Sequence, residues 1–148
     1  MKITGKYSID ASRELIWKMI IDPKVLEKIT PGVKTLEPKG EDTYKAMSEV
    51  KVGPVRGDFE GDLSLEHKVE GESCVVLLDQ KSKMGNAKAE IGLKLISLGD
   101  NKAEIQYTGE AKMSGMLARM GQRIMSGVVS TLSKQFFKAL EEEIENAK

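Results

Sequence analysis

The stretch KVGPVRGDFEGDLSL, Lys51 to Leu65, alternates strictly in its second half between polar and apolar residues. Acidic residues occupy positions 58, 60 and 62, and Phe59 and Leu63 fall on the opposite side. An alternation of period two is typical of a strand with one buried face. Gly57 and Gly61 stand on the apolar side, although glycine weakens a strand and leaves nothing to pack. The sequence therefore raises the question of what fills the space beside this strand.

The same alternation continues over most of the chain, from about Val33 to Met113. Gly53-Pro54 and the sequence LGDNK at residues 98–102 interrupt it with signals that are typical of hairpin turns. Residues 2–9 show the same pattern and form a first strand. Consecutive strands that are apolar on one side and joined by hairpins predict an antiparallel meander with one solvent-exposed face and one buried face.

Two short helices are expected between the first strand and the meander. Asp10 is the predicted cap of the first, in which apolar residues recur at helical spacing with Trp17 beside them. Asp22-Pro23 is a second start signal, because a capping residue is followed by proline at the first helical position. Thr30-Pro31-Gly32 is expected to end this second helix.

One long helix is predicted over residues 115–147, where nothing interrupts an apolar stripe. The stripe recurs every three or four residues and consists of Leu117, Met120, Ile124, Val128, Leu132, Phe136, Leu140 and Ile144. Such a helix would be about 45 Å long at 1.5 Å per residue. Propensity alone does not stabilise it, so we expect it to cover the apolar face of the sheet.

Length and composition limit the classes of function that the protein can have. The chain has 148 residues, which predicts a single domain spanning residues 1–148. Lys plus Arg is 23 and Asp plus Glu is 23, and this balance argues against a nucleic-acid partner. The strand-like N-terminus has no apolar segment of a signal peptide, and a single cysteine fits the reducing cytoplasm, so we expect a cytoplasmic protein.

The residue counts and motifs also argue against several kinds of metal site and catalytic site. With His67 and Cys74 as the only residues of their types, a His/Cys zinc site is close to excluded. The chain has no P-loop, no dinucleotide-binding glycine fingerprint and no G-x-S-x-G nucleophile motif. We therefore predict no catalytic residues, no metal and no cofactor.

The order of the elements is that of the helix-grip fold of the START-like (SRPBCC) superfamily. More narrowly, the chain resembles the family of the carbon monoxide dehydrogenase G subunit, and the matching residues are Trp17, Asp22-Pro23 with Leu26, Ile29–Gly32, Lys51–Gly61, Tyr107, Leu117–Arg123 and Phe136-Phe137. The resemblance implies an α+β fold in which a curved seven-stranded antiparallel sheet wraps the C-terminal helix. It also implies an accessory role beside a molybdenum-hydroxylase dehydrogenase, in attachment to the inner face of the membrane or in delivery of a lipid-like electron acceptor such as a quinone.

Small residues recur on the predicted inner face of the sheet. They are Gly5, Ala46, Gly57, Gly61, Ala87, Ala89, Gly109 and Ala111. Either they let the helix sit close to the sheet above a solid interior, or sheet and helix enclose an apolar cavity. Packed interiors tolerate few voids larger than a water molecule, so a cavity of this size would need a ligand. Four methionines around the start of the helix favour a wall that adapts to a guest.

We therefore predict a protein that binds a hydrophobic small molecule between sheet and helix. The expected ligand-binding residues are Trp17, Tyr44, Phe59, Gly61, Tyr107, Met113, Leu117, Met120, Ile124 and Val128. The hydroxyls of Tyr7, Tyr44 and Tyr107 are expected to orient a polar end of the ligand. Two other hypotheses remain: a cyclase- or hydrolase-like enzyme that uses the cavity tyrosines, and a protein-interaction module with a filled interior. An enzyme would need titratable groups that face inward.

Overall fold

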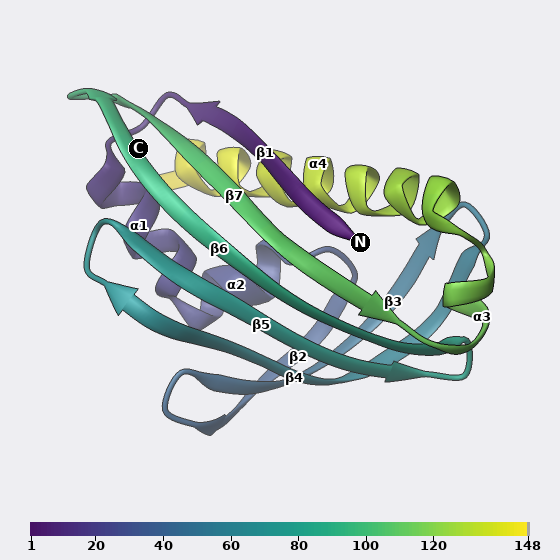
Figure 1. Cartoon of the computed structure of the whole chain (residues 1–148). Helices are drawn as coiled ribbons and strands as arrows, with labels where there is room; N and C mark the ends of the chain where they lie inside the picture. Colours follow the sequence, from purple (N-terminus) through teal and green to yellow (C-terminus); the bar gives the residue numbers. More distant parts are fainter. Residues whose placement is uncertain (148) are drawn as a thin grey trace.

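Seven antiparallel strands form one sheet in the computed structural model, which describes residues 1–147 (Figure 1). The strand order is β1-β7-β6-β5-β4-β3-β2, so β2 to β7 form a meander and β1 pairs with β7 at one edge. The strands are β1 (Lys2–Ile9), β2 (Val33–Gly40), β3 (Thr43–Val52), β4 (Val55–Val69), β5 (Ser73–Ser82), β6 (Gly85–Gly99) and β7 (Lys102–Met113). The predicted helix-grip architecture is confirmed.

The stretch that opened the sequence forms the β3–β4 hairpin. Val52 pairs with Val55 across the Gly53-Pro54 turn, as predicted. Phe59 and Leu63 of β4 are buried on the inner side, while the acidic residues at 58 and 60 are exposed. The alternation in the sequence therefore reports the two faces of the sheet correctly.

Two short helices follow β1, as expected. They are α1 (Arg13–Ile21) and α2 (Pro23–Ile29). Asp22 caps α2, since its side chain accepts a hydrogen bond from the backbone N–H of Lys24. The prediction that Asp10 caps α1 is wrong. Ser12 caps α1 and accepts from the backbone N–H of Leu15 at 3.1 Å, because only the residue directly before the helix reaches the free N–H groups of its first turn.

The C-terminal segment consists of two helices, α3 (Gly115–Arg119) and α4 (Gln122–Ala147), so the prediction of one continuous helix is wrong. Gly121 has a φ of 88°, a left-handed conformation that ends α3 and redirects the chain. The carbonyl of Gly121 then accepts the N–H of Met125 at 3.1 Å, which begins α4. The two helices can therefore turn different faces toward the sheet.

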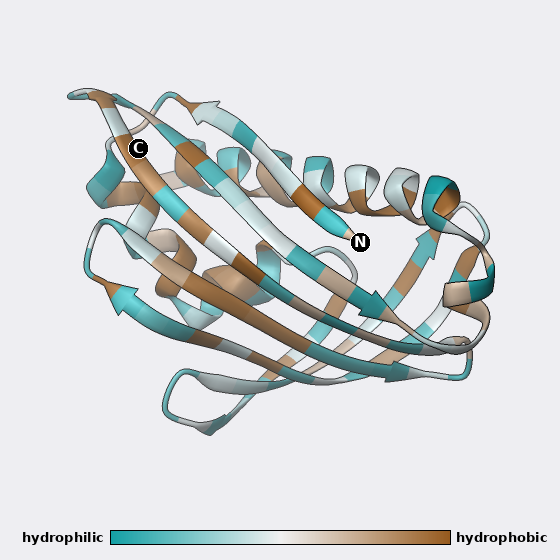
Figure 2. Ribbon diagram, in the orientation of Figure 1, coloured by the Kyte–Doolittle hydropathy of each residue, from teal (hydrophilic) through white to brown (hydrophobic). Residues whose placement is uncertain are grey.

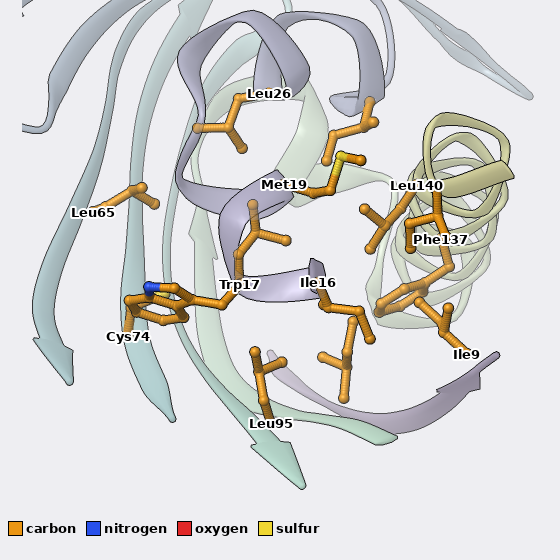
Figure 3. Close-up of a cluster of buried hydrophobic side chains, with 14 of the residues drawn as sticks. Ile9, Ile16, Trp17, Met19, Leu26, Leu65, Cys74, Leu95, Phe137 and Leu140 are labelled. Carbon is orange, nitrogen blue, oxygen red and sulfur yellow. The ribbon is translucent and has the colours of Figure 1, made fainter. Parts of the chain in front are cut away.

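The curved sheet wraps around α4, and the hydrophobic side of α4 is turned toward the sheet (Figure 1 and Figure 2). Beneath α4, the buried apolar side chains form two separate clusters. The larger cluster surrounds α1 and α2 and includes Ile16, Trp17, Leu26, Phe137 and Leu140 (Figure 3). The smaller cluster lies beside α3 and consists of Val55, Phe59, Leu117, Met125 and Val128.

Candidate functional site

An apolar cavity of about 340 Å³ lies between the sheet and α4. Its walls extend from Ile20 and Leu26 in the larger cluster to Leu117 and Met125 in the smaller one. Ligand sites in proteins typically measure about 300–1,000 Å³, so this cavity is at the lower end of that range. The core is thus divided by a space large enough for a small ligand.

Side chains in the middle of the sheet remain partly accessible although they point inward beneath α4. Val76 and Leu78 of β5 and Ala89 and Ile91 of β6 all line the cavity, and none of them is fully buried. In a close-packed interior such residues would be covered by neighbouring atoms. Their partial exposure shows that the cavity extends to the inner face of β5 and β6.

Three of the glycines on the inner face do not leave this space open. A Cβ at Gly61 would overlap the backbone carbonyl of Asp79 on β5, and a Cβ at Gly109 would overlap that of Glu90 on β6. A Cβ at Gly5 would overlap the hydroxyl of Tyr107. These glycines are required by close approach of neighbouring atoms, which accounts for one of the two glycines in the opening stretch.

Alanines provide the room instead, and Gly57, the other glycine of that stretch, has free space beside it but does not line the cavity. The nearest atom to a Cβ built at Gly57 is the sulfur of Met84, 4.0 Å away. The alanines that line the cavity are Ala46, Ala87, Ala89 and Ala111. Ala89 stands directly between Leu78 on β5 and Ala111 on β7 in the strand register. Short side chains on adjacent strands thus leave a continuous gap below α4.

Five of the ten predicted ligand-binding residues line the cavity. They are Phe59, Tyr107, Met113, Leu117 and Val128. Phe59 and Val128 belong to the smaller cluster, and Tyr107 reaches the cavity from β7. The structure therefore brings together sheet and helix residues that are far apart in the sequence.

The other five predicted residues lie elsewhere. Trp17 and Tyr44 are buried in the larger cluster, and Gly61 faces the backbone of β5. Met120 packs against the smaller cluster without lining the cavity, and Ile124 is 45% exposed. Met120 is the C-cap residue of α3, and Ile124 lies on the outer side of α4.

The inner face of α4 includes Met125 and excludes Ile124. Successive residues of a helix are about 100° apart, and Met125 points inward with 6% exposure, while Ile124 is 45% exposed. Val129 and Ser133 line the cavity one and two turns further along. Val129 is not among the ligand-binding residues predicted from the sequence, and nothing in the sequence singles out Ser133.

Other wall residues on β5 and β6 are absent from the prediction. Leu78 and Gln80 of β5 face the cavity, as do Ile91 and Leu93 of β6. The strand alternation of β6 already places Ile91 and Leu93 on the inner side. For β5 the signal is weaker, because this strand carries apolar residues on both faces.

Few polar groups reach the cavity wall, and they are Thr30, Ser48, Gln80, Lys88, Tyr107 and Ser133. Gln80 donates from Nε2 to the backbone carbonyl of Asp62 at 3.3 Å. The ammonium of Lys88 lies 3.9 Å from the Asp79 carboxylate and is largely exposed, so its charge is outside the cavity. The described wall contains no carboxylate and no histidine.

Cys74 contributes a thiol to the same wall. Burial raises the pKa of this thiol to about 11, because a thiolate would lose its hydration there. The thiolate is the nucleophilic form of cysteine. At neutral pH Cys74 is therefore protonated and acts as a small apolar side chain.

The three tyrosines differ in their surroundings. The Tyr7 hydroxyl donates a hydrogen bond to Oε1 of Glu141 on α4, and this bond raises the pKa of Tyr7. Tyr44 lies outside the wall, and desolvation raises its pKa. Tyr107 is the tyrosine that lines the cavity.

Residues 1–147 lack two further features. No three His, Cys, Asp or Glu side chains in this range converge as metal ligands would. No helix in the same range combines the length and apolar character needed to span a bilayer.

The sequence pattern of the family of the carbon monoxide dehydrogenase G subunit (CoxG) matches residues 5–145. The chain belongs to the CoxG family. The match includes all of the cavity-lining positions on β2 to β7 and α4, so the site described above is part of the CoxG domain. No curated protein matches the chain.

Solved structures of other proteins share the fold of this chain. A conserved protein from Geobacillus kaustophilus is 28% identical, with a TM-score of 0.96 over 99% of this chain and 97% of that one. A START superfamily protein from Mycobacterium smegmatis is 15% identical, with a TM-score of 0.76 over 99% of both chains. An aromatase/cyclase from Streptomyces sp. R1128 is 12% identical, with a TM-score of 0.73 over 98% and 93%. This CoxG chain therefore has the START-like helix-grip fold.

Proposed function

We propose that this CoxG chain binds one hydrophobic small molecule, lipid-like or quinone-like, in the cavity below α4. The observation that carries the proposal is the apolar space of about 340 Å³ that separates the two core clusters. An empty apolar void of this size would cost stability, because its lining atoms have no packing partners. A bound ligand restores those contacts.

The size of the cavity restricts the ligand. A volume near the lower end of the range for ligand sites suits a single chain or a single ring system, and not both chains of a phospholipid. Aromatic side chains provide much of the contact area, with Phe59 and Tyr107 on the sheet and Phe136 on α4. A quinone would place its ring inside the cavity, and its long tail would extend from the cavity toward the protein surface.

A groove between β1 and α4 offers a path for that tail. It shares five residues with the cavity, namely Ile3, Tyr107, Val129, Ser133 and Phe137. Its outer rim is polar and includes Thr4, Ser126 and Ser130. An entrance that is apolar inside and polar outside suits a ligand with one hydrophobic end and one polar end.

The biological role that we propose is the one that membership of the CoxG family implies. As a CoxG protein, the chain would serve as an accessory factor for a carbon monoxide dehydrogenase-type molybdenum hydroxylase, by delivering the bound molecule or by bringing the enzyme to the inner face of the membrane. Any such membrane contact would be peripheral, and the protein would act in the cytoplasm. No catalytic step is assigned to the chain itself.

Two alternative functions are less well supported. Aromatase/cyclases share the fold, but an enzyme of that kind needs groups that transfer protons at the reacting atoms. The described wall offers hydroxyls, one amide and a protonated thiol, which favours binding over catalysis. An interaction module with a filled interior does not fit the divided core.

Native mass spectrometry of freshly purified protein, followed by organic extraction, tests the proposal. We expect a noncovalent adduct that disappears on denaturation, and an extract that contains a quinone or a single-chain lipid. The extracted protein should then rebind that compound with one-to-one stoichiometry. A chain that carries no adduct and takes up no hydrophobic compound would contradict the proposal.

A further inference from the structure

Charge is segregated along this molecule, although its net charge is zero. In an antiparallel meander alternate turns lie at opposite ends. The β3–β4 turn, the β5–β6 turn and the connection from β7 through α3 to α4 therefore share one end, which we call the α3 end (Figure 1). It comprises residues 50–57, 80–89 and 111–126. These segments contain eight Lys and Arg residues and no Asp or Glu.

The opposite end is acidic. It contains the turns that join β2 to β3, β4 to β5 and β6 to β7, together with the last residues of α4 (Figure 1). Residues 41–42, 66–72, 98–104 and 141–147 include eleven Asp and Glu residues against two Lys residues. The long axis of the molecule thus connects a cationic end to an anionic end.

Most cations of the α3 end have no anionic partner. Lys51 and Lys88 form ion pairs with Glu49 and Asp79, at 3.7 Å and 3.9 Å. The other six form no ion pair with any residue of the described chain, and they are Arg56, Lys81, Lys83, Lys112, Arg119 and Arg123. Their charge is available to an external anion.

Exposed apolar side chains lie at the same end of the molecule as these cations. Met116 on α3 is 53% exposed, and Ile124 at the start of α4 is 45% exposed. Pro54 at the tip of the β3–β4 hairpin is exposed as well. Apolar residues surrounded by Lys and Arg are typical of segments that lie in the interface of an anionic bilayer.

We propose that the α3 end docks on an anionic lipid surface, with Met116 and Ile124 inserted among the acyl chains and Arg119 and Arg123 against the lipid phosphates. A bilayer suits projecting tips better than a protein partner does, because a stable protein interface needs about 800 Å² of complementary surface on each side. Docking would place the end of the cavity that Leu117 and Met125 line next to the membrane.

This inference deepens the peripheral membrane contact proposed above and rests on that function for its biological purpose. Its test is cosedimentation of the full chain with vesicles of phosphatidylcholine, alone or mixed with phosphatidylglycerol. We expect binding to the mixed vesicles only, weakened by high salt because the Debye length shortens. Arg119→Gln/Arg123→Gln should lower partitioning roughly 25-fold, since each basic residue near such a surface contributes about fivefold.

Replacing the exposed apolar residues tests insertion separately. Met116→Ser/Ile124→Ser should lower binding at least about tenfold, because two apolar side chains no longer leave water. Val69→Ser/Leu98→Ser is the matched control. These residues are 47% and 50% exposed at the acidic end, and their replacement should leave vesicle binding unchanged. Far-UV circular dichroism of each variant verifies the fold.

Several results would overturn the inference. They are equal binding to both kinds of vesicle or to neither, wild-type binding by the α3-end variants, and an equal loss in the control pair. Binding of the α3 end to an acidic protein without any affinity for vesicles would also overturn it. The assay uses protein from which hydrophobic compounds have been extracted, so it measures membrane binding independently of ligand binding. A negative result here would not contradict ligand binding in the cavity. Failure to detect a ligand would likewise not contradict membrane binding.

Discussion

The ring of Phe137 on α4 stacks on the ring of Tyr7 on β1, with centroids 4.7 Å apart and planes 6° from parallel. The Tyr7 hydroxyl continues to the Glu141 carboxylate one turn further along α4. Phe137 also contacts Tyr107 and Phe136, at 5.4 Å and 5.3 Å between ring centroids. This aromatic group packs α4 against the β1 edge of the sheet, and three of its rings, those of Tyr107, Phe136 and Phe137, line the cavity.

Tyr7→Phe should keep the stack and remove the hydrogen bond to Glu141. We expect the free energy of unfolding to fall by about 1 kcal/mol at neutral pH. The bond raises the folded pKa of Tyr7 above the ordinary value of about 10, so its contribution is complete below pH 10 and is lost as pH rises through the folded pKa. Urea unfolding between pH 7 and pH 11 measures both effects. An alkaline decline as steep in the variant as in the wild type would contradict this assignment.

Gly61 and Gly57 face the same side of β4 and should respond oppositely to alanine. Gly61→Ala would drive a Cβ into the carbonyl of Asp79, and we expect a loss of more than about 2 kcal/mol of unfolding free energy. Gly57→Ala meets no atom closer than the Met84 sulfur at 4.0 Å and should be neutral or stabilising by about 0.5 kcal/mol. Denaturant unfolding of the two variants provides the comparison, and similar losses at both positions would refute the distinction.

The sequence predicted the sheet and the first two helices because each rests on a local pattern. Alternation identifies the inner face of β4, and the Asp22-Pro23 pair starts α2 whatever lies around it. The cavity wall depends instead on contacts between strands. Gly57 and Gly61 look identical in the sequence, and only the path of β5 distinguishes them. The same holds for the end of α3, which depends on the left-handed backbone conformation of Gly121.

Gly121 and Gly127 test the helix break. Gly121→Ala places a side chain at a φ of 88° and should lower the unfolding free energy by about 1 kcal/mol. Gly127 lies in the interior of α4, and a Cβ built there would have no atom within 4 Å, so Gly127→Ala should raise the unfolding free energy by about 1 kcal/mol. Thermal and urea unfolding report both. Stabilisation by Gly121→Ala would mean that α3 and α4 join into one helix.

Filling the cavity is the most direct test of the binding site. Ala89→Leu adds bulk in the middle of the wall, between Leu78 and Ala111, and should lower the affinity for the fluorescent probe 1-anilinonaphthalene-8-sulfonate at least about tenfold. The free energy of unfolding should stay unchanged or rise by about 1 kcal/mol, because the added atoms gain packing partners. Glu90→Leu makes a similar change on the outer face of the same strand and should leave probe binding unchanged. If Ala89→Leu binds the probe as the wild type does, the ligand does not occupy the space between β6 and α4.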